Sequence, residues 1–288
     1  MDLRKLEIFA AVAQSGSFSA GAEQLHMAQP AVSIAIRKLE ESLGITLFDR
    51  SGRSIAVTAE GRQLLGRAQS ILQQVEDLAA SAGDLSGLLR GELSVSCPSM
   101  LATYFLPDLL SGFLTEHSGL TASVTQAGTT EIEDRLLRDD IELGVTTASG
   151  PGELERLPLI NEQMVVCVTE THPWARRRYL GIEDLHAAPM VVYESGYFIR
   201  AQLDQLCQAS ATKPELRMQS NFLPLLVRMV KQGIGVTVGL RTMAEQEPGI
   251  VGIPISPRVD VPMALAKRKG RTISRANQAF LDWVALQL

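Results

Sequence analysis

Apolar and polar residues alternate with a helical period between residues 29 and 43. Five apolar residues recur at positions i, i+3, i+4, i+7 and i+11, which indicates one buried face of a helix: Val32, Ala35, Ile36, Leu39 and Leu43. Gln29, Ser33 and Arg37 recur every four residues on the opposite face. Pro30 suits the first turn, because its fixed φ angle is already helical. The pattern predicts a helix with one packed side and one polar, outward side.

Shorter elements are expected on both sides of this helix. A short helix should open after Ser19, and a turn at residues 26–28 should lead into the polar-faced helix. Two short strands, at 46–48 and 55–58, should flank a polar loop that contains Arg50 and Arg53. A helix-turn-helix followed by a basic hairpin is a winged helix-turn-helix, with one helix for the major groove and a wing for the DNA backbone.

The outward face carries side chains that can read DNA, since glutamine pairs with adenine and arginine with guanine in the major groove. Ile34 should be exposed beside Ser33 and contact a thymine methyl group. The candidate DNA-binding residues are Ser17, Ser19, Gln29, Pro30, Ser33, Ile34, Arg37, Lys38, Arg50 and Arg53. A helical hairpin that only packs in a core is the alternative. Residues 1–58 hold six basic and six acidic side chains, so binding that ignores sequence should be modest.

This region resembles the DNA-binding domain of the LysR-type transcriptional regulators. The resemblance rests on Phe9, Ser17-Phe18-Ser19, Ala22, Leu25, Gln29-Pro30-Ala31-Val32-Ser33, Leu39-Glu40, Leu43-Gly44, Leu47-Phe48, Arg50, Thr58 and Gly61. The chain departs from the family pattern at three positions, Gly21, Ala28 and Glu60. The helix expected at 29–43 is called the reading helix, because its outward face would read the major groove. Ala28 should remove a hydroxyl contact at the start of this helix, and Gly21 should slightly weaken the preceding helix.

Residues 59–88 contain no proline and carry a different apolar repeat. Spacings of four and three alternate, as in a coiled-coil seam, along Leu64, Ala68, Ile71, Val75, Leu78, Ala82 and Leu85. Leu65, Leu72 and Ala79 broaden the seam. An apolar seam of this length is too long to be covered by one small domain, so we expect a second copy of the chain to pair with it. The alternative is a single helix that packs on the core of its own chain. Three glycines, at 83, 87 and 91, predict a hinge after this helix.

Beyond residue 91 strands and helices alternate, which predicts a mainly parallel sheet with helices on both sides. Strands are expected at 92–97, 121–125, 142–146, 163–169, 189–193, 215–219, 235–238, 250–255 and 261–267, and helices at 103–117, 130–138, 197–209, 223–232 and 274–286. Two similar lobes, with chain crossings near 161–163 and 262–267, resemble a periplasmic-binding-protein fold.

The predicted fold class is therefore α/β, with an N-terminal winged helix-turn-helix domain, a long linker helix and a two-lobed sensor domain. We expect a DNA-binding domain at 1–58, a linker and dimerisation helix with its hinge at 59–90, and an effector-binding domain at 91–288. Lobe I should comprise about 91–161 and 267–288, and lobe II about 162–266.

Small hydroxyl and amide residues stand where strands are expected to end and helices to begin. Ligands of such sheets bind beyond the carboxyl ends of the strands, and free N–H groups at helix starts favour anions. The candidate effector-binding residues are Ser99, Met100, Thr129, Thr130, Thr146, Ser195, Phe198, Arg200, Asn221 and Phe222. Each can instead be only a helix cap or turn residue. Their equivalent places in two lobes indicate a cleft for a small, anionic effector, with Tyr197 as a ring at its rim.

Composition adds a few exclusions. A net charge of −5, the absence of a signal-peptide pattern and the absence of a long apolar run indicate a cytoplasmic protein with no membrane partner. Three cysteines and four histidines are dispersed, so we expect no metal site, no disulfide framework and no cofactor.

The resemblance implies a sequence-specific transcriptional regulator and no catalytic activity. Its expected partners are double-stranded DNA, a small-molecule effector, further copies of the chain (a dimer through the linker helix, then a tetramer) and RNA polymerase. Effector binding should close the lobes and move the reading helices through the hinge at 83–91.

Two other functions remain open. An enzyme with the same two-lobed fold is one, although we find no GxSxG motif and no phosphate-binding loop, and the glycines at 233, 235 and 239 follow a helix in the wrong order for a dinucleotide site. A redox sensor that uses Cys97, Cys167 or Cys207 is the other, although buried cysteines are usually inert.

Overall fold

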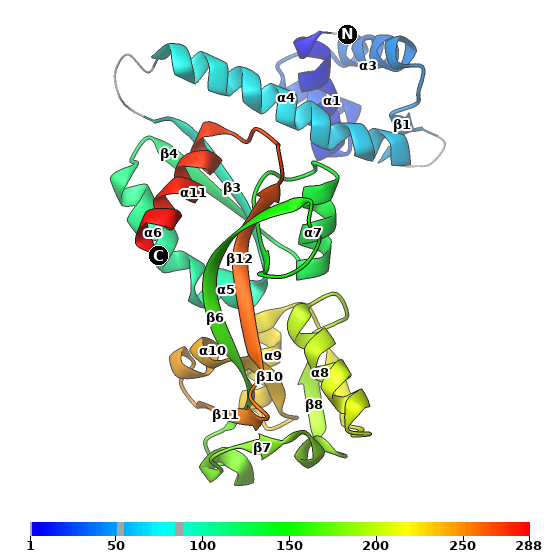
Figure 1. Ribbon diagram of the computed structural model, residues 1–288. Coiled ribbons are helices and arrows are strands. Elements are labelled where there is room, and N and C mark those ends of the chain that lie inside the picture. The colour runs from blue at the N-terminus through cyan, green and yellow to red at the C-terminus, as the bar shows by residue number, and fades with distance from the viewer. Residues whose placement is uncertain (1, 51–54, 84–88) are drawn as a thin grey trace. The chain divides into compact units, whose positions relative to one another are not determined.

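The computed structural model describes residues 2–50, 55–83 and 89–288 (Figure 1). Contacts between residues divide the chain into two compact units. The first unit is Met1–Gly91 with Arg138–Ile141, and the second unit is Glu92–Leu137 with Glu142–Leu288. Among the described residues, no helix combines the length and the apolar character needed to cross a membrane.

In the part of the chain that the structure describes, the first unit contains four helices and a small hairpin. They are α1 (Leu3–Ser15), α2 (Phe18–Gln24), α3 (Gln29–Leu43), β1 (Phe48–Asp49), β2 (Ala56–Val57) and α4 (Ala59–Gly83). The centres of the Phe9 and Phe18 rings each lie 5.6 Å from the centre of the Phe48 ring, so strand β1 of the wing packs against both α1 and α2. β1 and β2 pair in antiparallel orientation to form the wing.

The predicted two-faced helix is confirmed. Val32, Ile36 and Leu39 are completely buried on α3, and the other two members of the predicted face are packed against the same core. The helix before it starts two residues earlier than the sequence pattern predicted. The Ser17 side chain accepts a hydrogen bond from the N–H of Ala20, which makes Ser17 the N-cap of α2 and places Ser19 inside it.

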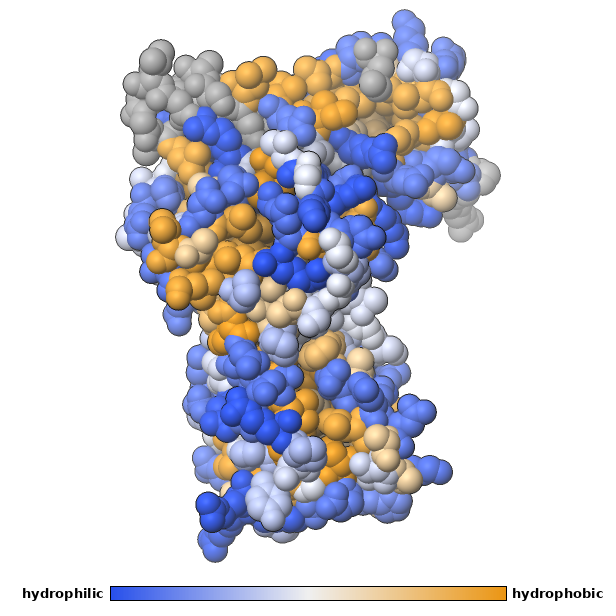
Figure 2. Space-filling model, in the orientation of Figure 1, coloured by the Kyte–Doolittle hydropathy of each residue, from blue (hydrophilic) through white to orange (hydrophobic). Residues whose placement is uncertain are grey.

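The long helix α4 changes its surroundings along its length. Its first turns pack on the core of the first unit through Leu64, Leu65, Ala68 and Leu72. Farther along, Ile71 and Val75 are each 39% exposed and Leu78 is 72% exposed. Figure 2 shows apolar surface along this part of the helix. Of the predicted seam, the side chains of Ala79 and Ala82 and the whole of Leu85 lie outside the described residues.

The second unit has two lobes joined by two long strands, β6 (Leu154–Thr169) and β12 (Asp260–Arg268) (Figure 1). Lobe I contains β3 (Gly91–Cys97), α5 (Ser99–Tyr104), α6 (Leu106–Glu116), β4 (Leu120–Gln126), α7 (Thr129–Leu137), β5 (Gly144–Thr147) and α11 (Arg275–Gln287). Lobe II contains β7 (Leu180–Gly181), β8 (Pro189–Val192), α8 (Phe198–Ala209), β9 (Glu215–Gln219), α9 (Leu223–Lys231), β10 (Thr237–Leu240), α10 (Arg241–Gln246) and β11 (Ile250–Ser256).

The sheet is mixed, so the prediction of a mainly parallel sheet was wrong. Its strand order is β4-β3-β5-β12-β6-β11-β7, with β10 also paired to β6. β12 runs antiparallel to β5 and β6, and β10 and β11 run antiparallel to β6. Strand direction was missed because a strand buried on both faces is a continuous apolar run in either orientation. The two segments that were expected to cross between the lobes lie side by side, since Pro262 pairs with Asn161 and Asp260 with Gln163.

The single helix predicted at 103–117 is in fact two helices, α5 and α6. The backbone of Phe105 leaves the helical region at φ −123°, and Pro107 follows in the first turn of α6. Proline cannot donate the N–H that would continue α5, so the chain bends there. The break gives α5 its own direction, which matters for the two hollows described below.

Candidate functional site

The polar face of α3 is open in the first unit. Gln29 donates from Nε2 to Ser33 Oγ at 2.8 Å, and Arg37 is exposed one turn beyond. Ile34 is 50% exposed next to this row. Pro30 and Lys38 are exposed as well, so five of these residues are accessible and Ser33 is half-buried. An amide, a hydroxyl, a guanidinium and an aliphatic group are thus presented together on one helix face.

Arg50 of the wing was predicted to contact DNA, but it is paired within the first unit. Arg50 donates to Glu40 Oε2 at 2.9 Å, and its guanidinium lies 5.0 Å from the centre of the Phe18 ring. Arg50 therefore holds the wing to α2 and α3 within the unit, and it is not a free cation. Arg53 lies outside the described residues. Ser17 uses its hydroxyl oxygen as the α2 cap.

Sequence reasoning noted Glu40 only as part of a family pattern, yet its carboxylate joins the reading helix to the wing. Oε1 accepts hydrogen bonds from the N–H groups of Leu47, at 2.8 Å, and Phe48, at 3.3 Å. Oε2 pairs with Arg50. The side chain is only 15% exposed. The sequence offered one signal for this role, since Glu40 directly follows Leu39 of the predicted buried face. A carboxylate that is partly buried there needs hydrogen-bond or ionic partners.

A small cavity of about 40 Å³ lies between the lobes of the second unit. Three helices, α5, α7 and α8, begin at it, as expected for the ends of strands in such a fold. It is lined by Pro98, Ser99, Met100, Leu101, Thr129, Tyr193, Tyr197, Phe198, Ile199, Leu240, Val261 and Met263. Four of the predicted effector-binding residues, Ser99, Met100, Thr129 and Phe198, are in this set.

The wall of this cavity is mostly apolar, with a few hydroxyl groups. The hydroxyls of Ser99 and Tyr193 are 2.9 Å apart and buried. The ring of Tyr193 stacks on that of Tyr197 with centroids 4.7 Å apart. Among the described residues, no arginine, lysine or histidine lines the cavity. An anion held here would depend on hydroxyl and backbone N–H donors at helix starts.

Contacts between the lobes surround this cavity. Gln126 Nε2 of lobe I donates to the carbonyl of Asn221 at 2.9 Å in lobe II. The N–H of Thr130 donates to the carbonyl of Gly196 at 3.4 Å. Gly128 makes this approach possible, because a Cβ atom there would lie 2.5 Å from the Gly196 oxygen. The two lobes are in contact around the cavity in this structure.

The other six predicted effector-binding residues lie outside the lining of the cavity. Arg200 points elsewhere, because its guanidinium donates to Asp204 at 2.9 Å and to the carbonyl of Tyr193 at 2.6 Å. Thr146 is fully buried and donates to Glu133. The remaining four are exposed on the lobe surfaces: Thr130, Ser195, Asn221 and Phe222. The sequence pattern missed Tyr193, Leu240, Val261 and Met263, since inward strand residues have no distinctive local signal.

Comparison with known families gives two matches that together span almost the entire chain. Residues 3–62 match the bacterial regulatory helix-turn-helix protein model of the lysR family, and residues 86–288 match the LysR substrate binding domain model. The chain belongs to the LysR family of transcriptional regulators. The LysR fold class predicted from the sequence is therefore confirmed, and the protein is a regulator rather than an enzyme.

Individual relatives show how far the likeness extends. A RuBisCO operon transcriptional regulator of Acidithiobacillus ferrooxidans is 30% identical, over 98% of this chain and 93% of its own length. The HTH-type transcriptional regulator YcgK of Bacillus subtilis is 27% identical, over 98% of this chain and 93% of its own. The solved structure of full-length CbnR with its target DNA has a TM-score of 0.74 at 24% identity and covers 100% of both chains.

The cysteines of this LysR chain are in surroundings that disfavour redox chemistry. Cys97, Cys167 and Cys207 are all buried and carry free thiols. Burial raises the pKa of the Cys167 thiol to about 12 and also raises the pKa values of Cys97 and Cys207. Because the thiolate is the reactive form, these side chains are poor redox sensors.

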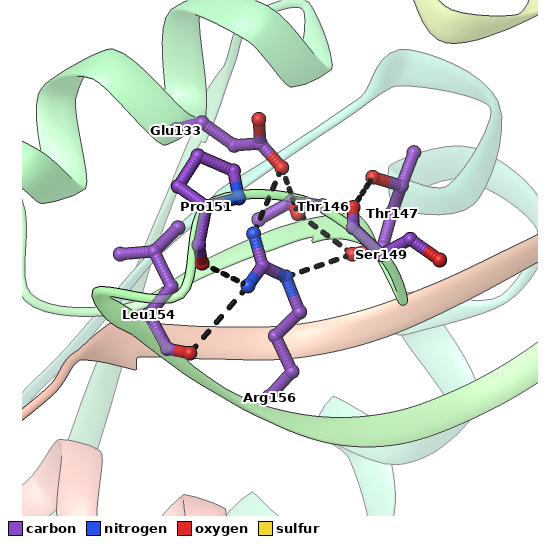
Figure 3. Close-up of polar contacts among 7 residues, drawn as sticks. All are labelled: Glu133, Thr146, Thr147, Ser149, Pro151, Leu154 and Arg156. Atoms are coloured by element: carbon purple, nitrogen blue, oxygen red, sulfur yellow. Dashed lines mark hydrogen bonds and ion pairs between the residues drawn. The ribbon is translucent and has the colours of Figure 1, made fainter.

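A buried arginine organises the turn between β5 and β6 of lobe I (Figure 3). Arg156 Nη2 lies 3.2 Å from Glu133 Oε1 on α7, and the two side chains are 10% and 20% exposed. Its Nε donates to the carbonyl of Thr147 at 3.1 Å, and its Nη1 to that of Pro151 at 2.7 Å. Thr146 donates to the same Glu133 oxygen at 2.8 Å. Neither Arg156 nor Glu133 belongs to a local pattern in the sequence.

Proposed function

We propose that this LysR-type regulator reads specific DNA sites with the exposed face of α3 and responds to a small effector in the cavity between its lobes. The observation that carries the DNA half is the row of Gln29, Ser33, Ile34 and Arg37, all turned away from the core of the first unit. The related CbnR was solved with its target DNA, which supports the same role here. Ser17, Ser19, Pro30, Lys38 and Arg53 are proposed as neighbouring backbone contacts.

The same proposal includes assembly and location. The apolar residues exposed on α4, Ile71, Val75 and Leu78, favour pairing with a second copy of the chain, so that two reading helices act on two half-sites. We propose a tetramer as the final assembly and RNA polymerase as a further partner. Because the DNA of a bacterium is in the cytoplasm, the protein is proposed to act there.

For the effector we propose a small anion with an apolar body. Its charged end would accept hydrogen bonds from Ser99, Thr129 and the first N–H groups of α8, which are the donors at the cavity. Its apolar body would lie against Met100 and Met263. Binding would change how firmly the lobes hold together, and the linker helix would transmit the change to the reading helices.

Replacing Arg37 by alanine tests the DNA half. A good bidentate contact to a base contributes about 1–3 kcal/mol, so we expect a loss of roughly 5- to 150-fold in affinity for a selected genomic site. Fluorescence anisotropy with that site and with random duplex measures the effect. Arg217→Ala, which removes an exposed arginine from the other unit, serves as the control and should leave affinity unchanged. Equal affinity of the wild-type chain for selected and random DNA would overturn the assignment.

Replacing Gly128 by alanine tests the effector half. The new methyl group would lie 2.5 Å from the Gly196 oxygen, so the lobes could no longer approach as closely. Thermal-shift screening of the full chain against carboxylates first identifies a ligand, which at 100 times its Kd should stabilise the folded chain by about 2.7 kcal/mol. We expect Gly128→Ala to bind the best such carboxylate at least about tenfold more weakly. Gly152→Ala, with open space around the new methyl group, is the control. An unchanged effector affinity in Gly128→Ala would place the effector elsewhere.

A further inference from the structure

A second and larger hollow lies on the lobe interface, outside the effector cavity. It is a groove of about 480 Å³ between α5 of lobe I and α9 and α10 of lobe II, and α5 contacts α10 directly. Figure 1 labels these three helices. Its lining is Thr103, Tyr104, Leu223, Pro224, Val227, Arg228, Lys231, Gln232 and Glu247. The set shares no residue with the effector cavity.

The groove carries an uncompensated positive charge. Its lining includes two cations, Arg228 and Lys231, and one carboxylate, Glu247. Lys231 lies 2.7 Å from Glu247 Oε2, and the Tyr104 hydroxyl donates to Glu247 Oε1 at 2.6 Å, so both carboxylate oxygens are occupied. Arg228 is exposed, and within the described part of the chain its side chain has no hydrogen bond or ion pair. One guanidinium is therefore available to an anion.

The α9 side of the groove carries apolar residues beside its cations. Leu223 and Val227 lie one turn apart on α9 and are mostly buried, and Pro224 is exposed between them. Arg228 follows Val227 directly, so the cation stands at the edge of an apolar surface. A ligand with an anionic group and a short apolar part would satisfy both, because a guanidinium binds carboxylate or phosphate with paired N–H donors.

The groove is connected to the effector cavity through a single short helix. The first turn of α5 contributes Ser99, Met100 and Leu101 to the cavity, and its last turn contributes Thr103 and Tyr104 to the groove. Thr103 Oγ1 donates to the Ser99 carbonyl at 2.8 Å, which joins the two turns. Gln246 Nε2 of α10 donates to the Tyr104 carbonyl at 3.2 Å. A molecule bound in the groove would thus act on both lobes and on α5.

We propose that this groove is a second small-molecule site, for an anionic metabolite that carries a short apolar group. Arg228 binds the anionic group, and Leu223, Pro224 and Val227 contact the apolar group. Occupancy holds α5 against α9 and α10, and thereby modulates the effector cavity. This site stands on its own contacts and does not depend on the identity of the effector.

Phenyl phosphate is a suitable probe, because it joins a dianionic group to a small ring. Saturation-transfer NMR and calorimetry with the full chain should give saturable binding with Kd of about 1 mM or below. Arg228→Ala should weaken that binding at least about tenfold, since it removes a charge-assisted contact, and Arg228→Lys should weaken it less. Arg217→Ala, which removes an exposed arginine outside the groove lining, should leave the affinity for phenyl phosphate unchanged.

Three results would overturn the proposal. The first is the absence of saturable binding up to about 10 mM phenyl phosphate. The second is binding that persists at wild-type affinity in Arg228→Ala, which would assign the probe to another site. The third is binding that disappears as the chain associates at higher protein concentration, which would identify the groove as a contact between copies. None of these results would bear on DNA recognition by α3.

Discussion

Replacing Arg156 by methionine is expected to destabilise the second unit by about 3 kcal/mol. Methionine keeps most of the length of the side chain but removes every donor of the guanidinium. Glu133 would then remain as a half-buried carboxylate without its counter-charge, and the carbonyls of Thr147 and Pro151 would lose their donors. Breaking a buried ion pair costs more than the pair contributes, because the remaining charge is already desolvated.

Calorimetric unfolding of the full chain measures this loss in the transition of the second unit. Arg258→Met is the matched control, because Arg258 pairs with Asp260 at 2.7 Å on the surface, where the side chains are 62% and 45% exposed. Such a pair contributes about 0–1 kcal/mol. Removing both members, in Arg156→Met with Glu133→Leu, should cost less than the sum of the single changes. Equal losses in Arg156→Met and Arg258→Met would contradict the assigned role.

Replacing Gly61 by alanine is expected to destabilise the first unit by about 2–3 kcal/mol, although alanine is the better helix former. A Cβ atom at this position in α4 would lie 2.4 Å from the carbonyl oxygen of Leu47 and 2.8 Å from a methyl group of Val57. The Thr58 hydroxyl accepts from the N–H of Gly61 at 2.9 Å and donates to the Thr46 carbonyl. The substitution would therefore push α4 away from both strands of the wing.

Urea unfolding and DNA affinity together test this prediction. The displaced wing should also weaken binding of a selected DNA site, because the wing and α3 are joined through Glu40. Gln63→Ala places an alanine at an exposed position of the same helix and should change stability by less than about 0.5 kcal/mol. A Gly61→Ala chain that is as stable as Gln63→Ala would show that α4 does not need this close approach.

Prediction from the sequence succeeded where the signal is local. The two-faced pattern of α3 was identified because side chains three and four residues apart share a helix face regardless of the rest of the fold. Ser99, Thr129 and Phe198 were placed near the cavity for a similar reason, since each stands at a helix start. Arg200 was misjudged because nothing in its neighbourhood in the chain shows that it reaches the Tyr193 carbonyl.

The sequence by itself determined the outward polar row on α3, the start of α4 and the alternation of strands and helices after residue 91. These follow from hydrophobic period, proline position and turn residues, which act over a few residues. Only the tertiary structure decided that β12 returns antiparallel beside β6, that Arg156 is buried against Glu133, and that α5 forms the groove with α9 and α10. These features join segments far apart in the chain, and their energy depends on burial and on which partners meet, properties that no local pattern contains.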